Sequence, residues 1–525
     1  IEPRLSLQWF VDMKNISAPA LEHVMNGDIK FYPDNMKNTY RHWMENIKDW
    51  CISRQLWWGH RIPAWYFGEG EEDFVVAKTK EEALKLGTEK TGRTITDVEL
   101  NQDEDVLDTW FSSWLWPISV FDGLTNPNNE EINYYYPTND IVTAPEIMFF
   151  WVARMVIAGY EWMGEKPFKN VYYTGIVRDK LGRKMSKSLG NSPDPIKLIE
   201  DFGADGVRIG MLVSSPAGND LPFDTSQCEQ GRNFTNKVWN AFRLVSSWEV
   251  AEIEQPKSSK IAVEWFESKL NETLIHINDQ FDKFRISDAL MASYKLVWDD
   301  FCSWYLEMIK PAYQQPIDAT TKAQTIAFFE KLMKIIHPFT PFISEEIWHL
   351  LGDRKEGEDI IVATWPEAGK VNEKLMDNFK ITSEVISNIR NIRKQNNIAN
   401  KIEIELGIVK SSNHPEQMDP VLVKMANVAA LSYIDEKMAN SFSFIVKNSS
   451  FYIPFGDTVD IEGEIEKVKE ELEYTKGFMK SVQKKLGNER FVNNAPDAVV
   501  NIEKKKLADA QEKIKILEEK MKNLG

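Results

Sequence analysis

The spacing of hydrophobic residues changes near residue 231. Before it, short apolar runs alternate with polar segments, which is typical of a parallel α/β fold. A strand at 141–142 is expected to break at a proline into a helix that carries Glu146 in its first turn. The next buried strand is predicted over VYYTGIV, residues 171–177, and leads directly into GRKMSKSLGNSPDP, residues 182–195. Because ligands bind beyond the carboxyl ends of parallel strands, this segment is expected at a ligand-binding edge.

Beyond residue 231 the apolar residues follow helical spacing, which predicts a helical bundle. One helix and alternating strands after residue 371 then predict a small α/β unit. The last 67 residues carry two runs of 4-3-4-3 spacing separated by a Gly, Asn and Pro-containing break, which predicts an antiparallel coiled coil. Its expected seam positions are Ile461, Ile465, Val468, Leu472, Thr475, Met479, Val482 and Leu486 in the first helix and Val500, Glu503, Leu507, Ala510, Ile514, Leu517, Met521 and Leu524 in the second.

Composition narrows the class of protein. The 525 residues carry a formal net charge of -17, and no apolar run approaches the roughly 20 residues that cross a bilayer. The three cysteines form no CxxC pair, which gives neither a disulfide framework nor a thiolate zinc site. No protein-bound metal is expected. A reducing cytoplasm fits best. The chain starts without Met or a signal-like segment, and we expect it to be a piece of a longer protein.

The segment 182–195 is basic within an acidic chain. Lys184 and Lys187 are three residues apart and lie between two glycines, so a tight loop can bring both ammonium groups to one ligand. Together with the hydroxyls of Ser186 and Ser188 they suit a polyphosphate whose charge shifts during a reaction. The alternative is an exposed loop that is basic by chance.

The distal part of the predicted coiled coil is also basic, with eight basic and three acidic residues between Lys476 and Lys506. Two interpretations are open: a solvated or dimerising hairpin, or an arm that contacts nucleic-acid phosphates. The candidate contact residues are Lys480, Lys484, Lys485, Arg490, Lys504 and Lys505.

The order KMSKS, GN and DP resembles the signature loop of class I aminoacyl-tRNA synthetases. Several further segments are similar to the C-terminal portion of the valyl-tRNA synthetase family. They are DWCISRQLWWGHRIPAWY, DVLDTWFSSWLWP, FFWVARM, GRNFTNKVWNAFR, PFTPFISEEIW, IRNIRKQNNI and the predicted terminal coiled coil. This resemblance covers essentially the whole chain. The isoleucine and leucine enzymes share the loop and part of the first segment, and an isoleucyl-tRNA synthetase relative is one alternative.

The resemblance implies a multidomain fold, α/β plus α. It contains the second half of a Rossmann-like parallel sheet, a helical-bundle anticodon-binding domain, a small α/β unit and a C-terminal antiparallel coiled coil. The expected parts are the tail of an editing insertion with a return linker (1–40), the catalytic half-fold (41–177, with a polar insertion at about 68–105), the KMSKS loop and stem-contact region (178–230), the anticodon-binding domain (231–370), the α/β junction domain (371–458) and the coiled-coil tRNA-binding arm (459–525).

The same resemblance assigns candidate site residues. Lys184 and Lys187, with Ser186 and Ser188, are expected to bind the ATP phosphates, the two lysines as catalytic groups. Glu146 stands where the family usually has an Asp that contacts the adenylate ribose, so TAPEI departs from the family pattern. The residues that match the valine side-chain pocket are Trp110, Ile147 and Trp151, for which ordinary core packing is the alternative.

The implied activity is ATP-dependent activation of valine and its transfer to tRNA(Val), with Mg²⁺ accompanying ATP, by a monomeric cytoplasmic ligase. None of the seven histidines forms the HxGH motif that the family also uses, so we expect the 525 residues alone not to form valyl-adenylate. Two further alternatives are a non-catalytic tRNA-binding protein on the same scaffold and an oligomerising coiled-coil scaffold.

Overall fold

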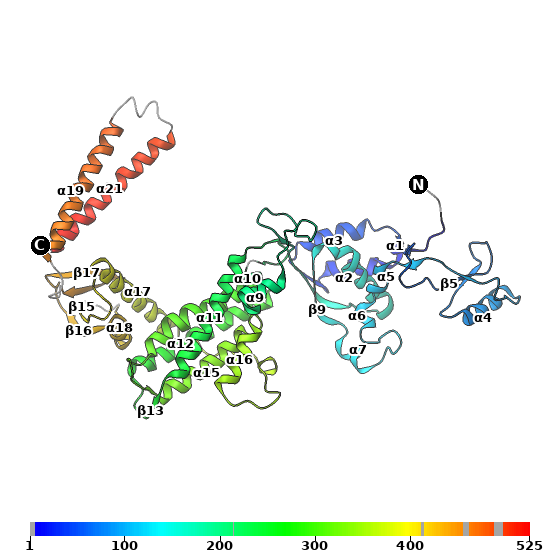
Figure 1. Ribbon diagram of the computed structural model, residues 1–525, viewed down its shortest axis with the longest axis horizontal. Coiled ribbons are helices and arrows are strands. Elements are labelled where there is room, and N and C mark those ends of the chain that lie inside the picture. The colour runs from blue at the N-terminus through cyan, green and yellow to red at the C-terminus, as the bar shows by residue number, and fades with distance from the viewer. Residues whose placement is uncertain (1–5, 214, 411–413, 455–460, 488–496, 525) are drawn as a thin grey trace. The chain divides into compact units, whose positions relative to one another are not determined.

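The computed structural model describes residues 6–213, 215–410, 414–454, 461–487 and 497–524 (Figure 1). The chain forms two compact units. Unit 1 contains Ile1–Arg232 and Asp279–Leu290, and unit 2 contains Asn233–Asn278 and Met291–Gly525.

A three-stranded parallel sheet forms the centre of unit 1. Its strands are β2 (Lys30–Tyr32), β9 (Thr138–Thr143) and β10 (Phe168–Tyr173), in the order β2-β10-β9. Val171 of β10 lies opposite Phe31 on one side and Ile141 on the other. The expected parallel sheet is therefore present. β2 was not expected, because KFY is too short to show a period and lies in the segment assigned to a linker.

The strand predicted over 171–177 ends earlier, at Tyr173. The N–H of Thr174 still donates to the Thr143 carbonyl at 2.9 Å, after which the chain leaves the sheet. It then forms β11 (Val177–Arg178), which pairs in parallel with β12 (Leu221–Pro222). The KMSKS segment therefore lies in the chain between the two strands of a second sheet.

The helix predicted after β9 is present but irregular. It begins as a 3₁₀ turn, η1 (Pro145–Ile147), widens to a π-helix, η2 (Met148–Ala153), continues as α8 (Arg154–Ala158) and ends as a second π-helix, η3 (Gly159–Met163). Residues 152–158 are all buried, with Val152, Val156 and Ile157 fully so. Wide π-turns concentrate at functional sites, and this one carries Trp151.

The polar insertion at about 68–105 folds around its own small core. Strands β5 (Ala64–Tyr66), β6 (Phe74–Val76) and β7 (Asn101–Gln102) form an antiparallel sheet beside α4 (Lys80–Thr91). The buried side chains of this core are Phe67, Val75, Ala77, Ala83, Ile95 and Leu100.

The other elements of unit 1 are short. They are β1 (Phe10–Val11), α1 (Met13–Ile16), α2 (Ala18–Asn26), α3 (Met36–Glu45), β3 (Trp50–Cys51), β4 (Ser53–Arg54), β8 (Val106–Leu107), α5 (Thr109–Ser113), α6 (Trp116–Ser119), α7 (Glu130–Tyr135), α9 (Pro195–Phe202) and α10 (Ala204–Val213).

Unit 2 begins with long helices around an aromatic core. The core includes Phe266, Phe301, Tyr305 and Phe329, with ring centroids 4.8–5.4 Å apart for the pairs in contact. The helical elements are α11 (Thr225–Ser247), α12 (Lys257–Asp282), α13 (Ile286–Lys295), η4 (Leu296–Tyr305), α14 (Leu306–Ile309), α15 (Ala319–Ile336), α16 (Pro341–Leu351) and η5 (Ile360–Val362), with β13 (Val250–Ala251) paired to β14 (Ile317–Asp318). α11, α12 and α13 cross the boundary between the two units.

A four-stranded mixed sheet with two helices follows in unit 2. Its order is β16-β15-β18-β17, in which only β15 and β16 are parallel. The elements are α17 (Glu373–Gln395), β15 (Ile404–Val409), η6 (Glu416–Met418), α18 (Asp419–Ala426), β16 (Val428–Ile434), β17 (Ser441–Val446) and β18 (Ser449–Pro454).

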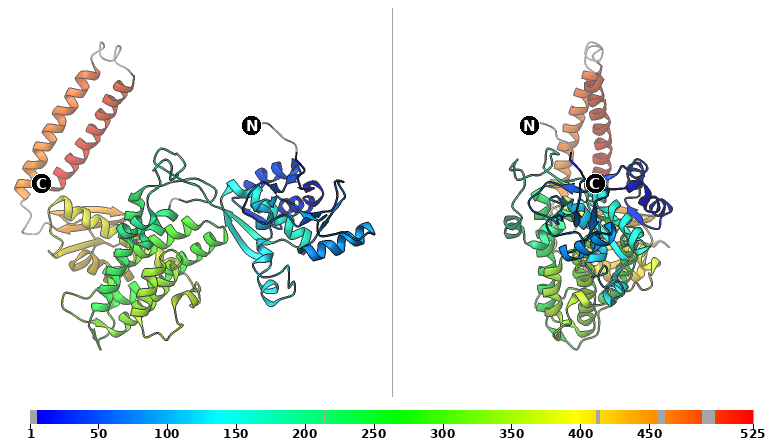
Figure 2. Two further views of the ribbon diagram at one scale, coloured as in Figure 1. Left: turned by 45° about the vertical axis from the view of Figure 1, so that its right-hand side comes forward. Right: turned by 90° about the vertical axis from the view of Figure 1, so that its right-hand side faces the viewer.

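The last two helices, α19 (Ile461–Leu486) and α21 (Asp497–Leu524), lie side by side in all views (Figures 1 and 2). They are antiparallel, because Lys476 pairs with Glu518 while Lys485 lies near Glu503. Side chains that fall on predicted seam positions are buried between them: Leu472, Thr475, Val482, Glu503, Ala510 and Leu517. No helix in the described parts of the chain is long and apolar enough to cross a membrane.

Candidate active site

A pocket of about 420 Å³ lies in unit 1 beyond the carboxyl end of β9. Trp110, Ile147 and Trp151, the three residues expected around valine, all line it. Trp110 comes from α5, whereas Ile147 and Trp151 come from the turns that follow β9. The 3₁₀ turn running into a π-helix thus presents two residues four apart to one space.

The pocket walls are held by hydrogen bonds and ring stacking. The indole N–H of Trp151 donates to the Ser113 carbonyl at 3.2 Å, which ties η2 to α5. Trp116 stacks on Trp151 with ring centroids 5.6 Å apart. Indoles fixed in this way give rigid apolar walls. The further lining residues, absent from the sequence-based prediction, are Ser112, Ser113, Trp116 and Ser119.

Asp108 positions Trp110. The Asp108 carboxylate is buried, caps α5 by accepting the Trp110 N–H at 2.8 Å, and accepts the Trp50 indole N–H at 3.3 Å. It also forms an ion pair with Arg54 of β4. One carboxylate therefore joins the strand region to the helix that carries a pocket wall.

Asp108→Ala is expected to lower the free energy of unfolding by about 2 kcal/mol, because it removes a helix cap and leaves the Arg54 charge without its partner. Denaturant titration followed by tryptophan fluorescence measures this. Asp12→Ala is the matched control, since Asp12 precedes α1 without capping it, and a loss below about 0.5 kcal/mol is expected. Equal effects of the two substitutions would contradict the assigned role of Asp108.

The KMSKS loop is organised by Asp179 and Asn191. Asp179 accepts the backbone N–H groups of Leu181 and Arg183 at 3.0 and 2.9 Å. Asn191 donates to the Asp179 carboxylate at 3.0 Å and accepts the Ser186 N–H at 2.9 Å. The hydrogen bond from Asn191, with those from Arg183 and Leu181, holds the pKa of Asp179 well below its usual range.

Two glycines let the loop turn. Gly182 and Gly190 have φ angles of +76° and +62°, where a side chain would be strained. In the GN pair, Gly190 therefore provides the turn, and the side-chain amide of Asn191 provides the hydrogen bonds that close the loop.

Asp179→Asn is expected to speed amide exchange in the segment 178–191 about tenfold at pH 7, because the ionised carboxylate holds the loop. Since the folded-state pKa is lowered, this contribution is complete above the ordinary pKa of about 4 and is lost as the pH falls from there through the folded-state pKa. Hydrogen–deuterium exchange read by mass spectrometry measures the change. Asp34→Asn, at an exposed carboxylate paired with Lys37, should leave the segment unchanged. Identical exchange of this segment in the wild type, Asp179→Asn and Asp34→Asn would refute the prediction.

Lys184 and Glu146 are in direct contact. The Lys184 Nζ lies 3.0 Å from both Oε1 and Oε2 of Glu146. Glu146 directly precedes the pocket residue Ile147, so this contact joins the loop to the rim of the pocket. Both side chains remain more than half exposed.

The other loop residues face solvent or one another. Lys187 and Ser188 are exposed, and the hydroxyls of Ser186 and Ser188 lie 3.1 Å apart. The loop therefore leaves Lys187 and the Ser188 hydroxyl accessible near the Lys184–Glu146 pair, whereas the half-buried Ser186 hydroxyl also accepts the Leu189 N–H at 3.3 Å.

The candidate arm lysines lie on α19 and α21. Lys480, Lys484, Lys485, Lys504 and Lys505 are exposed, whereas Arg490 lies outside the described residues. Lys485 Nζ is 3.8 Å from Glu503 Oε1, and Lys506 Nζ is 2.9 Å from the same oxygen. The hydrogen bond from Lys506 lowers the pKa of Glu503, so this buried carboxylate offsets part of the local positive charge.

Family models match three stretches of the chain. Residues 2–224 match "tRNA synthetases class I (I, L, M and V)", residues 263–408 match "Anticodon-binding domain of tRNA ligase" and residues 460–525 match "Valyl tRNA synthetase tRNA binding arm". A solved structure of Mycobacterium tuberculosis methionyl-tRNA synthetase in complex with methionyl-adenylate matches with a TM-score of 0.50 and 18% identity. It covers 67% of this chain and 66% of that one, and shows the fold.

Two curated relatives match nearly every residue. The valine–tRNA ligase of Parabacteroides distasonis is 58% identical over 99% of this chain, and that of Christiangramia forsetii is 55% identical over 100%. The chain spans 59% and 60% of the lengths of these relatives.

The parallel sheet, the KMSKS loop and the first family match together define the class: the chain belongs to the class I tRNA synthetases. Within that class it groups with the valine–tRNA ligases, to which it is similar from end to end and whose tRNA-binding arm its last 66 residues match. The resemblance inferred from the sequence motifs is thereby confirmed.

Proposed function

We propose that this chain forms part of a valine–tRNA ligase that activates valine with ATP, accompanied by Mg²⁺, and transfers it to tRNA(Val). One observation carries the proposal. The pocket residue Ile147 adjoins Glu146 in the chain, and the Glu146 carboxylate contacts Lys184 of the KMSKS loop at 3.0 Å. The contact therefore joins the pocket that we propose for valine to the loop that we propose for the ATP phosphates.

The pocket suits a small branched side chain. The indoles of Trp110, Trp116 and Trp151 and the sec-butyl group of Ile147 form its apolar walls, and burial of a valine side chain against such walls contributes about 1.5–3 kcal/mol. Trp151 is stacked on Trp116 and hydrogen-bonded to Ser113, and we propose that this wall does not retreat to admit a bulkier side chain. Apolar walls of this kind therefore suit an aliphatic side chain such as that of valine.

The loop suits the activation step. In that step a carboxylate oxygen of valine attacks the α-phosphorus of ATP, the bond to the bridging oxygen breaks, and pyrophosphate leaves with the negative charge. Lys184 and Lys187 would stabilise that charge as it develops. Lys184 must first leave Glu146, which costs about 1 kcal/mol or less because the pair is exposed. Glu146 is then free to accept a hydrogen bond from a ribose hydroxyl.

The remaining parts would hold the tRNA. The helices of residues 231–370 would read the anticodon, the unit at 371–458 would join them to the arm, and the coiled coil of α19 and α21 would contact the tRNA backbone. Residues 1–40 would close an editing insertion, and 178–230 would contact the acceptor stem. The three free cysteines agree with a reducing cytoplasm, and we propose a monomer there.

Aminoacylation by a chimaera tests the proposal. The chain would be joined to the part of the Parabacteroides distasonis ligase that it does not cover, and charging of tRNA(Val) would be measured with valine and with isoleucine. We expect charging with valine, at a kcat/KM at least about 100-fold above that with isoleucine. A correctly folded chimaera that binds tRNA(Val) without charging it would favour a non-catalytic tRNA-binding protein instead.

A further inference from the structure

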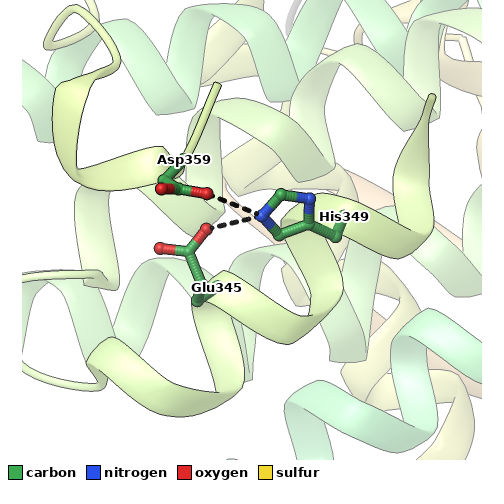
Figure 3. A group of neighbouring side chains, drawn as sticks. All are labelled: Glu345, His349 and Asp359. Atoms are coloured by element: carbon green, nitrogen blue, oxygen red, sulfur yellow. Dashed lines mark hydrogen bonds and ion pairs between the residues drawn. The ribbon is translucent and has the colours of Figure 1, made fainter. Parts of the chain in front are cut away.

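Three side chains near the end of α16 converge on one point of unit 2. Glu345 and His349 come from α16, and Asp359 comes from the loop that follows it (Figure 3). The His349 Nε2 lies 3.1 Å from Glu345 Oε1 and 3.2 Å from Asp359 Oδ1. All three atoms lie within 4.8 Å of one another. Both carboxylates therefore face the same ring nitrogen.

These separations fit the edges of a metal coordination polyhedron. Imidazole nitrogen and carboxylate oxygen bind zinc at about 2.0–2.2 Å. Two such ligands at tetrahedral or octahedral angles lie about 3.0–3.5 Å apart. The two N···O separations fall in that range, and all three ligand atoms lie within 4.8 Å of one another, so the three side chains can converge on one ion.

The fold holds the three ligands in place. Glu345 and His349 are one helical turn apart and share a face of α16. Glu345 Oε1 also accepts the Ile360 N–H at 3.1 Å, which brings the end of the loop to the helix.

The same loop is tied to α16 at two further points. The Trp348 indole N–H donates to the Glu358 carbonyl at 2.9 Å, and the Arg354 guanidinium lies 3.7 Å from the centre of the Trp348 ring. Asp359 is thus brought to His349 by contacts that do not depend on an ion.

The site is open on its outer side. The side chains of His349 and Asp359 are 41% and 52% exposed, so water can complete the coordination of a bound ion. One nitrogen and two oxygens, with open positions, suit a first-row divalent transition metal such as zinc, cobalt or nickel.

We propose that Glu345, His349 and Asp359 bind a divalent transition-metal ion that links the end of α16 to the loop at 352–359. This differs from the sequence-based expectation of no protein-bound metal, which rested on cysteine spacing alone. The site lies in the stretch that matches the anticodon-binding family and is independent of the pocket and loop of unit 1.

Zinc binding by the full chain tests the proposal. After treatment with a chelator, the wild-type protein is titrated with zinc in competition with a chromogenic chelator. His349→Ala and Glu345→Gln are each expected to raise the Kd of the tightest site at least about tenfold, a loss that even outer partners of a metal site can cause. Zinc is expected to raise the Tm of the wild type by about 2–4 °C and that of the variants by less than half as much.

His23→Ala is the matched control. His23 is similarly exposed and pairs with one carboxylate, its Nδ1 lying 2.6 Å from Asp28 Oδ2. The control should bind zinc like the wild type. If the wild type binds zinc no more tightly than His349→Ala, the three side chains form only a hydrogen-bonded triad, and the proposal is overturned. Glu345→Gln keeps the shape of the side chain and an acceptor for the Ile360 N–H, so loss of zinc there reports ligation rather than misfolding.

Discussion

Lys184→Met is expected to lower the rate of valine-dependent ATP–pyrophosphate exchange by about 10²–10³, the effect of removing one preorganised group that stabilises transition-state charge. The reaction would be measured in the chimaera with the Parabacteroides distasonis ligase. The KM for valine should change less than about threefold, because Lys184 contacts Glu146 at the rim and does not line the pocket. The variant should fold normally, since the ion pair that it loses is exposed.

Lys180→Met is the matched control for this prediction. Lys180 lies in the same loop, is 69% exposed and pairs with Asp224 at 3.0 Å, outside the KMSKS motif. A change of less than about twofold is expected. If the two variants lose activity equally, the effect reflects the overall charge of the loop. The prediction of a specific role for Lys184 is then wrong.

Charge reversal on the arm has the second large expected effect. Replacing Lys480, Lys484 and Lys485 by glutamate should weaken tRNA binding about 10- to 100-fold at low salt. It should also reduce the magnitude of the slope of log K against log salt by about 2–3, because each lost phosphate contact removes close to one unit. Lys485 should contribute least, since Glu503 lies 3.8 Å from it. Fluorescence anisotropy with labelled tRNA at several salt concentrations gives both quantities.

The control keeps the same change in net charge. Glutamate replaces three exposed lysines of unit 1, Lys14, Lys78 and Lys85, and affinity should fall less than about threefold with an unchanged slope. Unchanged affinity of the arm variant at low salt would show that α19 and α21 serve a structural role only.

The long-period features of the chain could be predicted from its sequence. The seam of α19 and α21 followed from 4-3-4-3 spacing, and the buried Leu472, Val482 and Leu517 fall on predicted positions. The buried face of such an antiparallel helix pair is specified by a local repeat, so its prediction needs no knowledge of the rest of the fold.

Elements that depend on distant partners could not be predicted in the same way. β2 has three residues and exists because β10 pairs with it. The π-turns of η2 and η3 lie in a run that is apolar on nearly all sides, so periodicity carries no signal for their width. The predicted strand at 171–177 extends beyond the end of β10 at Tyr173, because Val177 and Arg178 pair with β12 and leave the three-stranded sheet.

The candidate site was predicted in part. Trp110, Ile147 and Trp151 came from a family resemblance, and the structure brings them to one pocket. Lys184 and Glu146 are 38 positions apart in the sequence, so no local pattern could predict their contact. No sequence pattern marks Asp179 as a residue that holds the loop, whereas Asn191 belongs to the GN pair that follows KMSKS. At the proposed metal site the four-residue spacing of Glu345 and His349 could be seen in the sequence, but Asp359 could not.

A structure of the chimaera bound to a non-hydrolysable valyl-adenylate analogue tests the central claim most directly, namely that the pocket and the loop form one adenylate site. We predict the valine side chain between Trp110, Ile147 and Trp151, the ribose at Glu146, and the Lys184 ammonium released from Glu146. An analogue bound outside this pocket, or a Lys184–Glu146 pair unchanged beside a bound ribose, would contradict the account.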